Sequence, residues 1–173
     1  IELTNDLLPF TSTTIFIEYT LQIQSDRFTK YGVTKKGDYF LNYWYITPAV
    51  FEDSEWKLFS NKNLDDYYTP KSKLKLTLEI PHNYSASSEL NLNNVVNKSN
   101  THVFTFEGSD RVDTRLNIST APFFKFKIGD LNIISNNIDA DESLNQQINS
   151  FKKIVGFLND RLGVYPHENL MIS

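Results

Sequence analysis

The most constraining feature of the sequence is a strict alternation of apolar and polar residues, which is cleanest between Lys73 and Ile80. A period of two places successive side chains on opposite faces of a β-strand, whereas a helix needs apolar residues every three to four positions. This segment therefore predicts a half-buried strand, ended by Pro81, which cannot donate to a sheet. The inward-facing residues are Leu74, Leu76, Leu78 and Ile80.

The same kind of pattern predicts strands on both sides of this segment, six to eight in all. Thr13–Ile23 alternates and predicts a half-buried strand. Tyr39–Ile46 is apolar at nearly every position, which predicts a strand covered on both faces. Gly129-Asp130 predicts a tight hairpin between two of the later strands. The later segments are 84–96, 101–106, 112–118, 123–128 and 131–135, with a turn at 97–100.

The period changes after residue 135. From Asp139 to Leu162 the apolar residues follow each other at intervals of four and three, which predicts an amphipathic helix. Asp139 and Glu142 can form its capping box, and Gly163 stands where a helix-ending glycine is expected. Residues 169–173 then begin a new strand. The apolar stripe consists of Leu144, Ile148, Phe151, Val155, Leu158 and Leu162.

These patterns together predict a mainly β fold. Residues 1–135 form an antiparallel β domain, either saddle-like or a sandwich. Residues 136–173 form one amphipathic α-helix and the first strand of a second domain of the catalytic type. Because the chain begins at Ile1 without a methionine, we expect it to be part of a longer protein.

Composition excludes several classes of function. The net charge is −4 and the charges are dispersed, so the basic stripe of a nucleic-acid-binding protein is absent. No stretch reaches the roughly 20 apolar residues that span a bilayer. There are no cysteines, which excludes disulfides and thiolate metal sites. The compartment stays open, and a bacterial parent that is extracytoplasmic or membrane-associated is compatible with the chain.

The sequence shows no catalytic motif and no cofactor site. The three histidines, His82, His102 and His167, are not spaced as a zinc motif, and Met171 stands where an H-E-x-x-H helix would need its second histidine. Asp65-Asp66 is interpreted as a solvated loop. The aromatic run in 39–45 could stack on sugars or peptides, although core packing is the simpler interpretation.

Several segments resemble the N-terminal region of the gluzincin aminopeptidases, the zinc metallopeptidases related to membrane alanyl aminopeptidase. Leu162–Pro166 is similar to the family's helix end "fG-x-YP", which precedes a strand that leads toward the active site. Asn42–Trp56, Asp65–Tyr68 and Leu74–Pro81 are similar in order and spacing to one branch of the family.

The resemblance implies a non-catalytic domain. In the family a saddle-shaped β domain packs on a thermolysin-like catalytic domain and walls the peptide-substrate cleft. The zinc ligands lie beyond this region, so we expect no metal or cofactor in this chain, and zinc, the catalytic domain and the peptide substrate in the parent. Thr47 stands where family members place a Gln or Glu near the substrate's amino group. The expected cleft or interface residues are Trp44, Tyr45, Thr47, Trp56 and Tyr165.

Two other functions stay open on sequence grounds. The chain could be a stand-alone β-sandwich module that binds glycans or proteins through Tyr43, Trp44 and Tyr45. It could also be a scaffold domain of a catalytically inactive relative. An exposed apolar stripe on the helix of a monomeric chain would favour a domain of a larger metallopeptidase over these two functions, because a large apolar patch marks a missing partner.

Overall fold

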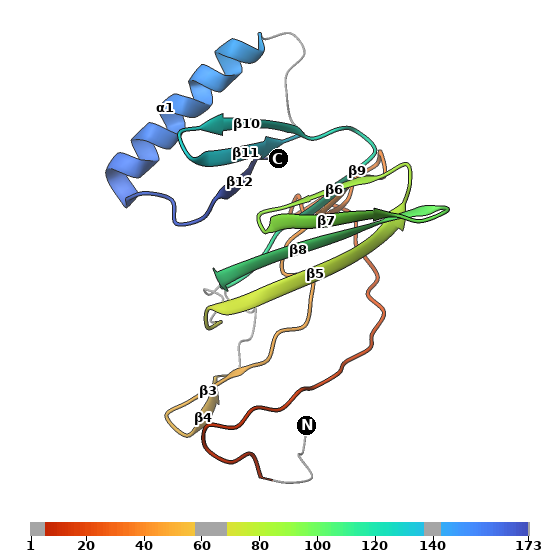
Figure 1. The fold of residues 1–173 in the computed structure, drawn as a ribbon, viewed down its shortest axis with the longest axis vertical. Coiled ribbons are helices and arrows are strands. Elements are labelled where there is room, and N and C mark those ends of the chain that lie inside the picture. Colours follow the sequence, from red (N-terminus) through yellow and green to blue (C-terminus); the bar gives the residue numbers. More distant parts are fainter. Residues whose placement is uncertain (1–5, 58–68, 137–142, 173) are drawn as a thin grey trace.

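A computed structural model describes residues 6–57, 69–136 and 143–172. Within these ranges the chain forms twelve strands and one helix (Figure 1), and the sheets are almost entirely antiparallel. The predicted mainly β fold followed by one helix is therefore confirmed. No helix in the described part is long and apolar enough to cross a membrane.

The longest sheet contains the strand that the sequence predicted best. It is three-stranded, in the order β5 (Ser72–Pro81), β8 (Thr101–Arg111) and β7 (Asn91–Asn97). In β5 the predicted inward residues are half-buried or buried and the residues between them are exposed, so the alternation is confirmed. The predicted turn between β7 and β8 is also present, closed by the Lys98 amide donating to the Thr101 carbonyl at 2.9 Å.

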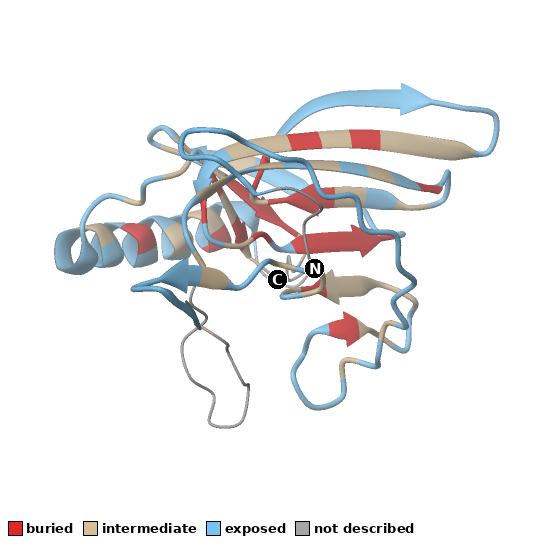
Figure 2. Ribbon diagram, turned by 90° about the horizontal axis from the view of Figure 1, so that it is seen from below, coloured by how far each residue is buried: buried red, intermediate tan, exposed pale blue. Residues whose placement is uncertain are grey.

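A second, four-stranded sheet packs against the long sheet and encloses the core. Its order is β1 (Gly32–Val33), β2 (Tyr39–Leu41), β9 (Leu116–Ser119) and β6 (Ser85–Ser88). All four residues of β9 are buried, and Figure 2 shows the buried residues gathered in the strands. The core cluster consists of Leu41, Ile80, Leu90, Phe104, Phe106, Leu116 and Ile118.

The third sheet joins the β region to the helix. It has the order β10 (Phe124–Ile128), β11 (Leu131–Ser135) and β12 (Asn169–Ile172), and the predicted β10–β11 hairpin turns at Gly129. β12 is parallel to β11, and α1 (Leu144–Leu162) connects them along one face of the sheet (Figure 1). The proposed boundary between residues 135 and 136 stays a prediction, although strands from both sides of it share this sheet.

The helix begins later than the pattern predicted. Ser143 is the N-cap: its hydroxyl accepts from the Gln146 amide at 3.3 Å, and the Gln146 side chain accepts from the Ser143 amide at 3.2 Å. This is a capping box of the expected kind with different residues. The predicted cap residues, Asp139 and Glu142, lie outside the described residues. Gly163 ends the helix as predicted, with φ 91° and its amide donating to the Asn159 carbonyl.

One predicted strand, Thr13–Ile23, is absent from the described residues, and another, 39–46, is shorter than predicted. Thr13–Ile23 runs without any ladder in the described structure, and its apolar side chains are mostly exposed, because no other described strand lies alongside to pair with it. The predicted strand 39–46 ends at Leu41, because Tyr43 adopts a left-handed φ of 52° that turns the chain.

Two further segments differ from the prediction. The region around Trp56, where the sequence predicted no strand, forms a small hairpin of β3 (Val50–Glu52) and β4 (Glu55–Lys57). Its turn residues Asp53 and Ser54 both have positive φ, as a two-residue hairpin requires. The predicted strand at 112–118 starts only at Leu116.

Candidate functional site

The best candidate site is a charged cavity of about 620 Å³, where the end of β8 meets the loop between α1 and β12. It combines three cations, three carboxylates, two tyrosines and a histidine from segments far apart in the sequence. Among these residues, the sequence pointed to Tyr165 as a cleft or interface residue and to Tyr43 as part of an alternative aromatic binding platform. The cavity is lined by Asn42, Tyr43, Lys71, Glu89, Ser109, Asp110, Arg111, Val112, Asp113, Arg115, Tyr165, Pro166 and His167.

Arg111 is a buried cation in the wall of this cavity. It is 6% exposed, and its Nη2 donates to the Glu89 carbonyl at 3.1 Å, while no described residue accepts from its Nε. Space for the side chain depends on Gly108: a Cβ there would lie 3.1 Å from Arg111 Nε and 2.7 Å from Leu90 Cδ2. Leu90 is itself buried in the core and cannot give way easily. The guanidinium is therefore held in a fixed place at the wall of the cavity.

Burial shifts the pKa values of the ionisable groups around Arg111. Desolvation raises the pKa of Glu89, and the nearby Arg115 and Arg111 oppose that shift. The pKa of Asp113 is also raised by burial, and that of Tyr165 is raised by burial and by the charge of Glu89. The pKa of His167 is lowered, first by burial and then by Arg111. Carboxylates and cations thus face each other in a partly dry setting, where charge interactions are stronger than in water.

We expect Glu89→Gln to flatten the pH dependence of stability above pH 4.5. A carboxyl whose pKa is raised by folding contributes stability that is complete below its unfolded value, 4.5, and is lost as the pH rises through the folded value. The free energy of unfolding, measured by urea titration at pH 4.5 and pH 7, should therefore fall less in Glu89→Gln than in the wild type.

Glu107 supplies a control, because folding shifts its pKa in the direction opposite to that of Glu89. Its pKa is lowered by a hydrogen bond and by the charge of Lys75, whose Nζ lies 3.0 Å from its carboxylate. Its contribution is present above pH 4.5 and is lost as the pH falls through the folded value. Glu107→Gln should change the titration below pH 4.5 and leave the interval from pH 4.5 to 7 as in the wild type. Equal curves for wild type and Glu89→Gln in that upper interval would contradict the assignment.

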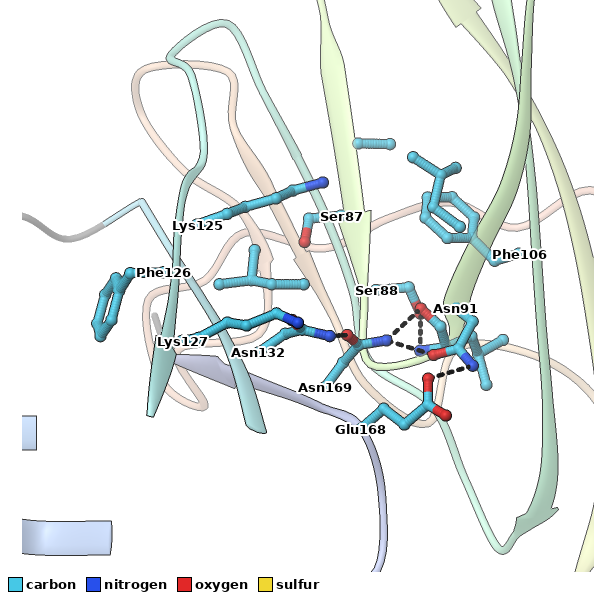
Figure 3. A pocket seen from close by; sticks show the side chains of 14 residues that line it. Ser87, Ser88, Asn91, Phe106, Lys125, Phe126, Lys127, Asn132, Glu168 and Asn169 are labelled. Carbon is cyan, nitrogen blue, oxygen red and sulfur yellow. Dashed lines mark hydrogen bonds between the residues drawn. The ribbon is translucent and has the colours of Figure 1, made fainter. Parts of the chain in front are cut away.

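A second cavity, of about 480 Å³, lies between the β10–β11–β12 sheet and the strands β6, β7 and β8. A row of amides closes one side of it (Figure 3): Asn132 Nδ2 donates to Asn169 Oδ1 at 3.0 Å, and Asn169 Nδ2 donates to the Asn91 side chain and the Leu90 carbonyl. Asn91 Nδ2 in turn donates to Glu168 at 3.1 Å. These bonds tie β12 to the core sheets, so this cavity has a structural explanation.

The structure brings together some of the predicted site residues. Tyr165 lines the charged cavity, and the side chain of Tyr45 hydrogen-bonds Asp113, which also lines it. Trp44 packs edge-on against Tyr45 with ring centroids 5.5 Å apart and contacts the core cluster. Their assignment to a cleft or interface stays a prediction.

The other two predicted site residues lie elsewhere. Thr47 is half-buried in the loop after β2 and is not part of the cavity wall. Trp56 is exposed on β4 and packs on Phe51 at a centroid distance of 5.0 Å, on the separate hairpin at the lower end of Figure 1. Sequence reasoning missed Arg111, because a charged residue at the end of a strand is ordinarily expected to be exposed.

The chain is similar in structure to a known protein. No protein-family model and no curated protein sequence matches the chain. Among solved structures it is similar to a crystal structure of a two-domain M1 zinc metallopeptidase, in a mutant form bound to L-arginine, with 16% sequence identity and a TM-score of 0.43. The similarity covers 59% of this chain and 26% of that one. The matched region is well under two thirds of the length of that protein.

Proposed function

We propose that this chain is a non-catalytic β domain of a larger, aminopeptidase-like zinc metallopeptidase, where it packs on the catalytic domain and helps to wall the peptide cleft. The observation that carries the proposal is an apolar face on α1 that the described residues leave exposed, next to an edge of β12 that they leave unpaired. The resemblance of Leu162–Pro166 to the family motif supports the same reading.

Within residues 6–57, 69–136 and 143–172, the chain covers only part of the apolar surface of α1. Val155 is buried, and the Phe151 ring packs on Phe126 of β10 at a centroid distance of 5.7 Å. Other apolar residues on the helix remain exposed, and Figure 2 shows α1 as largely exposed. They recur at positions i, i+3, i+4 and i+8 and so form one stripe, which we call the outer stripe: Ile154 (54% exposed), Phe157 (61%), Leu158 (41%) and Leu162 (82%). A contiguous apolar stripe of this kind marks an interaction surface.

The strand beside the helix is also incomplete in its pairing. β12 bonds only to β11 in the described structure, and the two are parallel. Parallel strands in known folds are covered on both faces, and an exposed strand edge offers unpaired amides and carbonyls to a further strand. A neighbouring domain that covers the outer stripe and extends the sheet past β12 would satisfy both elements.

No catalytic step is assigned to the chain itself. The described residues contain no group of three or more His, Cys, Asp or Glu side chains that could hold a metal, so they do not fit a catalytic zinc site. In this proposal the zinc belongs to the neighbouring domain, and the charged cavity with Tyr165 is the part of this chain nearest the substrate.

No observation favours the alternative of a free-standing glycan or protein binding module. That function needs an exposed aromatic platform, and the candidate residues Trp44 and Tyr45 are half-buried and turned edge to face against each other. Of the three aromatic residues Tyr43, Trp44 and Tyr45, only Tyr43 is exposed.

The coding sequence that follows Ser173 tests the proposal. The expected result is an H-E-x-x-H helix within about 150 residues and a glutamate ligand further on. A stop codon at this point, or a following region without those ligands, would overturn it. Peptidase activity in a purified sample of the 173-residue chain would overturn the non-catalytic role.

A further inference from the structure

Two histidines that the sequence keeps apart meet on the surface of the long sheet. His82 directly follows β5, and His102 lies on β8, where it pairs with Ile80. Their ring centroids are 4.2 Å apart, and the ring planes are inclined by 45°. His82 is exposed and His102 half-buried, so both rings are open to solvent on at least one side.

Each ring has one nitrogen fixed by an acceptor. His82 Nε2 lies 2.7 Å from the Lys98 carbonyl, and His102 Nδ1 lies 2.7 Å from the side-chain oxygen of Asn97. A carbonyl oxygen can only accept, so each of these nitrogens carries the proton. In the neutral rings the lone pairs are then on His82 Nδ1 and His102 Nε2.

The second hydrogen bond of each ring is a feature that this pair shares with metal-ligating histidines. Such a histidine almost always donates its other ring N–H to a carbonyl or carboxylate, which fixes the tautomer and orients the ring. Here both members of a close pair do so, through different partners. The acceptors lie on the same hairpin as His102, and that hairpin is closed by the backbone pairing of β7 with β8.

The charges beside the pair are already neutralised. Lys98 Nζ lies 2.7 Å from Glu79, and the Thr101 hydroxyl donates to the same carboxylate at 2.7 Å. The Lys98 ammonium group is therefore paired with a carboxylate, which reduces its repulsion of a bound cation.

We propose that His82 and His102 form a two-histidine site for a divalent transition-metal ion of the Zn²⁺, Cu²⁺ and Ni²⁺ class, with water in the remaining coordination positions. Imidazole nitrogen suits these ions, whereas Mg²⁺ and Ca²⁺ prefer oxygen ligands. The site is separate from the zinc expected in a neighbouring catalytic domain and does not depend on that proposal.

Calorimetric titration of the untagged chain with Zn²⁺ alone tests the site, because the chain has only three histidines and no cysteine. We expect one Zn²⁺ per chain, at least tenfold weaker binding in His82→Phe and in His102→Phe, and unchanged binding in the control His167→Phe. Imidazole NMR signals of His82 and His102, but not of His167, should shift with Zn²⁺. Mg²⁺ should give no heat of binding.

Asn97→Leu separates a metal site from a merely structural contact. It keeps both rings and removes the acceptor that fixes His102, so Zn²⁺ affinity should fall by about 10- to 100-fold. Circular dichroism verifies that each variant is folded. The proposal is overturned if the double variant His82→Phe/His102→Phe binds Zn²⁺ as tightly as the wild type, or if His167→Phe abolishes binding.

Discussion

Arg111→Leu is expected to lower the free energy of unfolding by about 3–5 kcal/mol. Arg111 is nearly fully buried and is one of the two cations that stabilise the charged form of Glu89. Without it, the Glu89 carboxylate keeps its burial penalty and loses part of its compensation, and the Glu89 carbonyl loses its donor. Chemical denaturation at pH 7 measures the loss.

The loss of unfolding free energy in Arg111→Leu should also depend on pH, whereas a loss caused by packing alone should not. The variant raises the pKa of Glu89 further, so stability should fall more steeply than in the wild type as the pH rises from 4.5 to 7. Arg115→Leu is the matched control for the loss of a cation without the loss of a buried side chain. Arg115 also lowers the pKa of Glu89, so its removal should steepen the pH dependence as well. Because Arg115 is exposed, the cost at pH 7 should stay under about 1 kcal/mol. A loss below 1 kcal/mol for Arg111→Leu would contradict the role given to it.

Asn169→Leu is expected to lower the free energy of unfolding by roughly 2–4 kcal/mol, because it breaks the amide row between β12 and the core. Leucine has a similar size and cannot hydrogen-bond. The Leu90 carbonyl and the side chains of Asn91 and Asn132 would each lose a partner at or near the buried interface. Thermal unfolding followed by circular dichroism measures the change.

Glu168→Gln provides the matched control for this row. Glu168 is exposed and lies at the end of the row, where it accepts from Asn91. A glutamine oxygen can accept the same bond, so the expected loss is small. If Asn169→Leu were no more destabilising than Glu168→Gln, the amide row would not be what holds β12 in place.

Local patterns in the sequence predicted the elements whose structure is decided locally. The alternation in β5, the Gly129 hairpin and the Gly163 helix end were all found where the pattern placed them. Thr13–Ile23 shows the limit of such reasoning: alternation predicts which faces a strand would have, but hydrogen-bonding partners come from the tertiary fold. The left-handed turn at Tyr43 likewise has no signal in an aromatic run.

The sites depended on information that the sequence does not carry. His82 and His102 meet only because the register of β5 on β8 sets Ile80 opposite His102. A hairpin prediction with that register would have found the pair. The burial of Arg111 follows from the close approach allowed by Gly108 and from the path of the loop after α1, and neither can be inferred from spacing along the chain.

The most direct test of the central claim is the chemical accessibility of the outer stripe of α1. The chain has no cysteine, so Phe157→Cys introduces a single thiol on the stripe, and Asp160→Cys introduces one on an exposed polar position of the same helix as a control. Maleimide labelling is compared between the 173-residue chain and the whole protein that contains it. We expect rapid labelling of both variants in the chain, and protection of Phe157→Cys alone in the whole protein. Equal, rapid labelling of Phe157→Cys in both would contradict the packing of this face against a neighbouring domain.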